Sequence, residues 1–117
     1  MPPIDYHDRY FRPISNSANG QVTGETEFHY RQTGDLLTGT YSGGGIRFGQ
    51  LVGRVHPDNS LEFVYQHLTD SGELRTGRCR SRHELLPEGR IRLHEDWQWT
   101  NGDHSRGQSV VEETLPR

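Results

Sequence analysis

The sequence predicts an all-β protein: one antiparallel meander of about eight strands that forms a closed or nearly closed barrel. Tight-turn signals recur along residues 22–114, and the segments between them are short and rich in Thr, Val, Tyr, Phe and Trp. This pattern is typical of consecutive β-hairpins, and no segment shows a convincing 3.6-residue helical period. The turn signals are Thr33-Gly34-Asp35, Gly43-Gly44-Gly45, Pro57-Asp58-Asn59, Asp70-Ser71-Gly72, Pro87-Glu88-Gly89 and Asn101-Gly102-Asp103.

These turns place the strands within a single domain spanning residues 1–117. Residues 1–8 hold two prolines and mixed charges, so we expect a loose N-terminal arm. A first strand at 9–14 is followed by the turn-forming Ser15-Asn16-Ser17. Residues 81–86 could instead form a short helical turn at the end of the strand expected near 74–83. The other strands are expected near 22–33, 36–42, 46–56, 61–69, 74–83, 90–100 and 105–114.

Loop length decides which residues lie opposite each other, and therefore which share a face. We choose a two-residue turn at Gly34-Asp35 and three-residue loops after Thr69 and Thr100. These loop lengths place aromatic residues opposite small ones. The resulting pairs are Tyr30 with Gly39, Tyr65 with Gly77, Phe63 with Cys79, Trp97 with Gly107, Glu95 with Ser109 and Leu93 with Val111.

Three of these pairs put an aromatic ring over a strand glycine: Tyr30 over Gly39, Tyr65 over Gly77 and Trp97 over Gly107. Glycine permits a sharp bend and the ring covers its bare backbone, a combination typical of strongly curved sheets. The pattern therefore favours a coiled sheet that closes on itself and leaves no exposed edge.

Composition limits the kind of interior that such a barrel has. Leu, Ile, Val and Phe together make only 24 of 117 residues, near the range of disordered chains. The net charge is only −3, however, and eleven aromatic residues supply large buried areas. We expect a small, aromatic and partly polar core, or a homodimer that buries one outer face.

Composition also bears on location and partners. Cys79 is the single cysteine, and we find no signal-peptide or membrane-spanning run, so we expect a reduced, cytoplasmic setting without membrane contact. A pI of about 6.1 argues against a nucleic-acid binder.

The carboxylate of Glu95 is the first candidate for chemistry. It is the only acid on an otherwise apolar face formed by Ile91, Leu93, Trp97 and Trp99. Burial raises the pKa of such a group, whereas a neighbouring Arg lowers it. Glu95 is either a core carboxyl held by Tyr, Ser or Arg, or an acid–base catalyst, and it points inward in both cases.

Two further candidates end the apolar face of the 61–69 strand. Tyr65 and His67 both exchange protons, and His67 is a general base or a rim histidine with one nitrogen in water. We interpret Cys79 as a small, inert core residue. Arg78, Arg80 and Arg82 alternate on one outer face. This stripe could bind an anion, but we interpret it as a solvated face whose arginines pair with Glu62.

No metal or cofactor is predicted. The seven histidines form no HExxH, CxxC or HxH pattern. The run of three glycines at 43–45 precedes no helix, so it is not a phosphate loop. The chain also lacks GxGxxG, GxSxG, Walker and acetyl-CoA-binding turns.

A family resemblance extends over residues 10–114. The chain resembles small bacterial proteins commonly labelled N-acetylglutamate synthase, a resemblance that implies no catalytic residue. The architecture is similar to small lipocalin-like or calycin-like barrels. The segments that carry the family resemblance are Phe11-Arg12-Pro13, Ser15-Asn16, Gly43-Gly44, Gly49-x-Leu51-x-Gly53, Gly72-Glu73, Thr76-Gly77-x-Cys79-x-Ser81, Ile91-Arg92-Leu93-His94-Glu95-x-Trp97-Gln98-Trp99-Thr100, Gly102-Asp103-x-Ser105 and Glu112-Glu113.

These observations favour a protein that binds a small, partly apolar molecule at the barrel interior or mouth. One alternative is a small enzyme that uses Glu95 with His67 or Tyr65 as acid and base. Another is a homo-oligomerising interaction module with a filled core. The predicted ligand-binding residues are Tyr30, Tyr41, Tyr65, His67, Glu95, Trp97 and Trp99.

Overall fold

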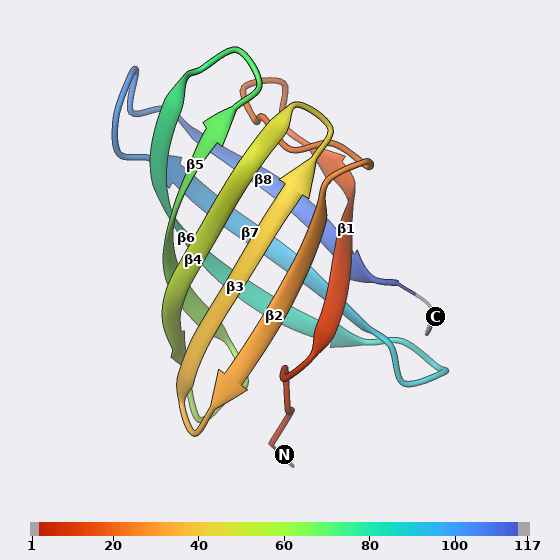
Figure 1. The fold of residues 1–117 in the computed structure, drawn as a ribbon. Helices are drawn as coiled ribbons and strands as arrows, with labels where there is room; N and C mark the ends of the chain where they lie inside the picture. The colour runs from red at the N-terminus through yellow and green to blue at the C-terminus, as the bar shows by residue number, and fades with distance from the viewer. Residues whose placement is uncertain (1–2, 115–117) are drawn as a thin grey trace.

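The computed structural model describes residues 3–114, which form eight antiparallel strands closed into one barrel (Figure 1). Each strand pairs with its neighbours along the chain, and the last closes against the first, so the predicted meander and its closure are confirmed. No helix among these residues is long and apolar enough to span a membrane. The strands are β1 Arg9–Asn16, β2 Glu27–Thr33, β3 Leu36–Gly43, β4 Ile46–Val55, β5 Leu61–Thr69, β6 Leu74–Leu85, β7 Ile91–Trp99 and β8 Arg106–Glu113.

The predicted registers are confirmed at all three hairpins. Tyr30 lies opposite Gly39 and Tyr65 opposite Gly77. Trp97 lies opposite Gly107, and the Trp99 amide donates to the Ser105 carbonyl at 3.0 Å. The alternation of inward and outward side chains follows from these registers.

The aromatic rings cover glycines as predicted at two of the three positions. A Cβ on Gly77 would collide with the Tyr65 ring, and one on Gly107 with the Trp97 ring. These rings therefore lie directly on the strand backbone, where only glycine leaves room.

Tyr30 pairs with Gly39 as predicted, but the prediction that its ring covers this glycine is wrong. The atoms nearest a Cβ on Gly39 belong to Leu51 and the His29 backbone, not to Tyr30. The Tyr30 ring packs instead against Phe11, with ring centroids 4.8 Å apart. Tyr41 takes the covering role, but over Gly49 of β4, which is its partner across β3 and β4.

Three strand limits differ from expectation by two residues or more. β2 begins at Glu27 rather than near 22, because a turn precedes it in which the Thr26 amide donates to the Thr23 carbonyl at 2.9 Å. β1 continues through a bulge after Pro13 to Asn16, so the turn expected at 15–17 starts later. β6 reaches Leu85, which pairs with Ile91, so 81–85 is strand and not a helical turn.

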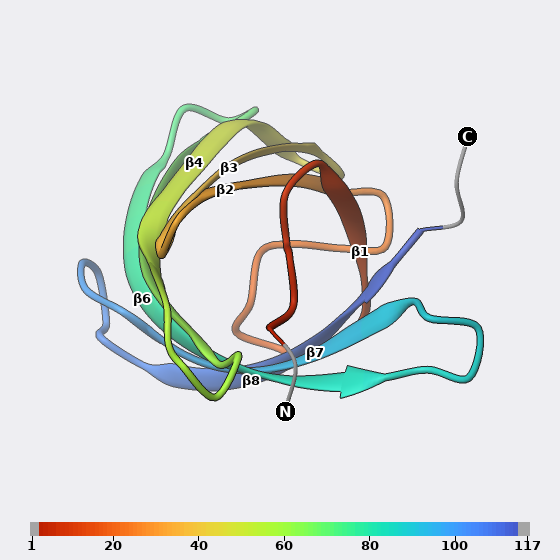
Figure 2. The ribbon, with the colours of Figure 1, turned by 90° about the horizontal axis from the view of Figure 1, so that it is seen from below.

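The N-terminal arm is packed, not loose, over its described residues. It crosses one open end of the barrel, as Figure 2 shows from below. Tyr6 is fully buried there, and its hydroxyl donates to the Asn59 carbonyl at 2.6 Å. The Tyr6 amide donates to Gln32 Oε1 at 2.9 Å, which fastens the arm to β2.

The half of the barrel next to this arm is filled. β1, β3, β5 and β7 all begin at that end, and their first inward residues meet Tyr6 in a core with almost no solvent exposure. The opposite end is crossed by the loop 17–26 between β1 and β2 (Figure 1). The filling residues are Tyr6, Phe11, Tyr30, Leu37, Leu61, Ile91, Leu93 and Val111.

We predict that Gly77→Ala destabilises the protein by about 1–3 kcal/mol, because the new methyl group displaces the Tyr65 ring from the backbone. Urea unfolding measures the change. Gly24→Ala is the control, since its Cβ would meet only one atom, at 3.6 Å, and about 0.5 kcal/mol or less is expected. Equal effects at both glycines would contradict the proposed ring contact.

Candidate functional site

A cavity of about 50 Å³ lies in the half of the barrel under the loop 17–26. Its wall combines inward residues of seven strands with the loop itself, and it is mainly aromatic. The cavity has room for only a few water molecules, since one water requires roughly 10–15 Å³ on this scale. The lining residues are Asn16, Gly20, Gln21, Val22, Phe28, Tyr41, Phe63, Tyr65, His67, Cys79, Glu95, Trp97, Trp99 and Ser109.

Glu95 is a buried carboxyl group in this wall and has no cationic partner. β7 points its side chain inward, and only 8% of the residue is exposed. Ser109 Oγ donates to Glu95 Oε1 at 2.8 Å, and Ser81 Oγ approaches Oε2 at 3.5 Å. No ion pair among residues 3–114 includes it.

Burial raises the pKa of Glu95 from 4.5 to about 7, although hydrogen bonds from Ser109, Ser81 and Cys79 oppose the rise. Desolvation dominates because no positive charge stabilises the ionised form. Near neutral pH the protonated and ionised forms of Glu95 are therefore both populated, so the group can donate or accept a proton.

His67 is held in one tautomer by a chain of hydrogen bonds that runs from the core to the surface. Gln21 Nε2 donates to Glu73 Oε1 at 2.7 Å, which turns its oxygen toward His67 Nε2 at 2.7 Å. His67 Nε2 must therefore be protonated, and it donates a hydrogen bond to Gln21 Oε1. On the other side of the ring, the Tyr41 hydroxyl donates to Nδ1 at 2.8 Å.

Burial, and to a smaller extent the positive charge of Arg75, lower the pKa of His67 from 6.5 to about 4. The imidazole is thus neutral at neutral pH, with both nitrogens already in hydrogen bonds. The prediction that His67 is a rim histidine with one nitrogen in water is wrong, because the loop residue Gln21 takes that place and only 3% of His67 is exposed.

The loop 17–26 closes this end of the barrel and is fastened to several strands. The Trp99 indole donates to the Asn19 carbonyl at 3.1 Å, and Asn19 Nδ2 donates to the Arg106 carbonyl at 2.9 Å. Asn16, where the loop begins, donates through Nδ2 to the Val22 carbonyl at 3.0 Å. Its Oδ1 is buried and has no hydrogen-bond partner.

The aromatic part of the wall is continuous. The Trp99 ring lies 5.4 Å from Trp97 and 5.8 Å from both Tyr65 and His67, measured between centroids. The guanidinium carbon of Arg75 lies 4.0 Å from the centroid of the Trp99 ring. This wall therefore already makes one cation–π contact at its edge.

Most of the predicted site residues come together around the cavity, and one does not. Tyr41, Tyr65, His67, Glu95, Trp97 and Trp99 line it, whereas Tyr30 belongs to the filled half. The Tyr30 hydroxyl is buried without a hydrogen-bond partner. No hydrogen bond joins Glu95 to His67 or Tyr65 directly among the described residues.

Sequence reasoning missed two groups of lining residues. Phe28, Phe63, Cys79 and Ser109 face inward by the same alternation that identified the candidates, so the register already contained that signal. No such signal marked Asn16, which was expected in a turn, or the loop residues Gly20, Gln21 and Val22, because their place depends on how the loop folds over the barrel.

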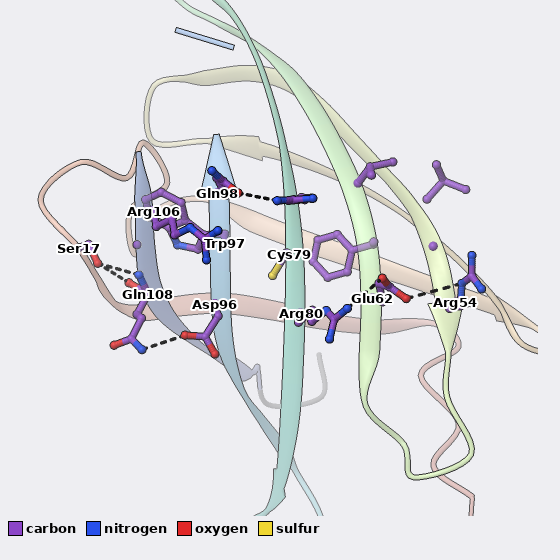
Figure 3. A pocket seen from close by; sticks show the side chains of 16 residues that line it. Ser17, Arg54, Glu62, Cys79, Arg80, Asp96, Trp97, Gln98, Arg106 and Gln108 are labelled. Carbon is purple, nitrogen blue, oxygen red and sulfur yellow. Dashed lines mark hydrogen bonds and ion pairs between the residues drawn. The ribbon is translucent and has the colours of Figure 1, made fainter. Parts of the chain in front are cut away.

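A second hollow, about 1170 Å³ and open to solvent, lies on the outer face of β4–β8 (Figure 3). The side chains of Glu62 and Asp96 line it. Arg80 approaches Glu62 at 3.7 Å, and Arg78 donates to Gln98 Oε1 at 2.7 Å. These contacts match the interpretation of the arginine stripe as a paired, solvated face.

Two other candidates from the sequence are the thiol of Cys79 and a metal site built on histidines. Cys79 is 4% exposed, and burial raises the pKa of its thiol well above the ordinary value, so it is an inert core residue. No group of three or more His, Cys, Asp and Glu side chains within residues 3–114 could hold a metal ion.

We predict that Glu95 and His67 affect stability with opposite pH dependence. The raised pKa of Glu95 means that the folded state loses stability as pH rises from 4.5 toward 7. The lowered pKa of His67 means that the folded state loses stability as pH falls from 6.5 toward 4. Relative to wild type, Glu95→Gln should therefore gain about 3 kcal/mol over the first interval, at about 1.4 kcal/mol per pH unit.

His67→Gln serves as the opposing variant, because it should gain a similar amount relative to wild type as pH falls from 6.5 to 4. Urea unfolding at several pH values gives the two differences. A substitution that only destabilises the fold would lower the free energy of unfolding by the same amount at every pH. Plots of this free energy against pH that run parallel to that of wild type would therefore contradict the prediction.

Comparison with known proteins agrees with this architecture. A family described as "Avidin-like protein" matches residues 4–114. A search of curated proteins gave no match. Nothing in these comparisons or in the structure supports the N-acetylglutamate synthase label. The eight-strand barrel and the match over nearly the whole chain show that this protein belongs to the avidin-like family.

Proposed function

We propose that this protein binds a small molecule in the barrel interior, beneath the loop 17–26. One observation carries the proposal: a buried carboxylate without a counter-charge lines an aromatic cavity, which the side chains of this half of the barrel leave open. Ligand sites are mostly apolar with a few convergent polar groups, and this cavity has that composition. Avidin-like proteins bind small ligands such as biotin, which also supports the proposal.

The cavity as it stands is much smaller than a typical ligand pocket of roughly 300–1,000 Å³. A larger ligand therefore requires the loop 17–26 to move. Its fastening is largely polar, through Asn19, Gln21 and Asn16, and Val22 adds a partly buried apolar contact with the core. Hydrogen bonds to water replace the polar contacts when the loop opens. Opening the loop therefore costs less free energy than displacing the packed side chains of the filled half.

Native mass spectrometry of freshly purified protein and a metabolite thermal-shift screen that includes biotin test this function. A bound mass or a stabilising metabolite supports the proposal. Failure of both experiments would refute it.

We predict that Cys79→Leu abolishes ligand binding, because the larger side chain occupies the cavity that Cys79 lines. The readout is loss of the bound mass or of the thermal shift. Val64→Leu is the matched control, since Val64 lies one strand away, points outward and is 55% exposed. Binding that survives in a folded Cys79→Leu protein would show that the ligand lies elsewhere.

Self-association through the outer hollow is a second proposed role. Val52 and Val64 lie side by side in it, each at least half exposed. Arg80 lies beside Glu62 and Asp96, and Arg78 and Arg106 line the same hollow, so the face carries both signs of charge. A second copy related by a two-fold axis fits such a surface, because an isologous interface must complement itself. Avidin-like proteins often form oligomers.

We predict that Val64→Arg converts a dimer to a monomer in light scattering coupled to gel filtration. The added charge would face like charges and apolar surface across the interface. Leu85→Arg is the control, because Leu85 is equally exposed, at 59%, but lies at the far end of β6. A wild-type protein that is monomeric at micromolar concentration would refute this second role.

A further inference from the structure

The polar groups around the interior cavity include acceptors that nothing in the chain satisfies. Glu95 receives hydrogen bonds from Ser109 at 2.8 Å, from Ser81 at 3.5 Å and from the Cys79 thiol, whereas an ionised carboxylate offers about four acceptor positions. Asn16 Oδ1 is buried at the same cavity with no donor at all. A buried acceptor without a partner is costly, so both groups favour a ligand that brings donors.

Several donors of the cavity wall, by contrast, are already used. The Tyr41 hydroxyl donates to His67, and the Trp99 indole donates to the loop backbone. The Ser109 hydroxyl donates to Glu95 itself. The His67 N–H donates to Gln21, so this imidazole offers nothing to a ligand. The polar demand of the cavity is therefore for hydrogen-bond donors.

The aromatic wall adds a preference for positive charge. The faces of Trp and Tyr rings attract cations electrostatically, more strongly once water is removed. The Arg75 guanidinium, 4.0 Å from Trp99, is such a contact within this chain, at the edge of the wall. Arg75 also approaches Glu73 Oε2 at 3.7 Å, and it forms no ion pair with Glu95.

We infer that the interior site takes a small organic cation with N–H donors, a primary ammonium or an amidinium, which pairs with Glu95 and donates to Asn16. This inference rests on the proposed function and names its ligand class. A head group of a few heavy atoms suits a cavity of about 50 Å³. A longer substituent would extend toward the loop 17–26.

Other ligand classes fit less well. An anion would place a second negative charge beside Glu95 in a site shielded from water, which is strongly unfavourable. A quaternary ammonium would contact the rings but leave Asn16 Oδ1 without a donor. A neutral amide would satisfy acceptors but leave the ionised Glu95 without a counter-charge, and it is the closest competitor.

The experiment uses the indole N–H signals of Trp97 and Trp99, the only two tryptophans, in ¹H–¹⁵N NMR spectra. The probes are two pairs of similar shape: ethylammonium against ethanol, and acetamidinium against acetamide. Each is titrated to tens of millimolar, because ligands with so few heavy atoms bind weakly. Phosphate buffer at pH 8 and constant ionic strength favours the ionised form of Glu95, whose pKa is about 7, and avoids amine buffers.

We expect the two cations to shift both indole signals at concentrations about tenfold lower than their neutral counterparts. Glu95→Gln should abolish that preference. Glu84→Gln is the matched control, because Glu84 is an exposed glutamate near the end of β6 that lines neither hollow and accepts from His94 at 2.8 Å. The control should keep the full preference for the cations.

Equal binding of cations and neutral probes to the wild-type protein would overturn the ligand class, while interior binding would stand. The same conclusion follows if Glu95→Gln retains the preference. The wild-type comparison needs no variant, so it decides the matter even if Glu95→Gln does not fold. Silence of both indole signals toward all four probes also overturns the class, and the Cys79→Leu comparison then decides the proposed function separately.

Discussion

Direct contact between aromatic rings and bare glycine backbone holds this barrel in its shape. Tyr41, Tyr65 and Trp97 each lie where a Cβ of the opposite glycine would be. A chain with so few aliphatic residues closes an eight-strand sheet because these rings fill the interior and glycine lets the strands curve around them. Closure then removes the sheet edges and gives every strand two partners.

This packing divides the interior into two unlike halves. Near the N-terminal arm, aliphatic and aromatic side chains fill the space, and Tyr6 closes the end. Toward the loop 17–26, the rings stand along the wall and leave room for Glu95, His67 and a small cavity. Glu95 and His67 lie in the second half, where Ser109, Gln21 and Tyr41 supply their hydrogen bonds.

Glu95 and His67 show how the same burial has opposite electrostatic effects. Desolvation raises the pKa of the acid and lowers that of the base, so both groups tend toward neutrality in the same cavity. They do not bind each other; serines hold one, and Tyr41 with Gln21 hold the other. The result is a site with an accessible acceptor and a fixed neutral imidazole, which suits recognition of a ligand better than proton transfer between the two residues.

Turn chemistry and two-residue alternation are local properties of the chain, and they are sufficient to predict the strand order, the registers of three hairpins and the inward faces of their strands. The residues that this local pattern alone assigns to the interior include Tyr65, His67, Glu95, Trp97 and Trp99. Three features emerge only in the folded barrel: Tyr30 lies in the filled half, Gln21 seals His67, and Glu95 lacks a cation. They depend on how side chains and loops from distant strands meet across the closed barrel, which no local pattern specifies.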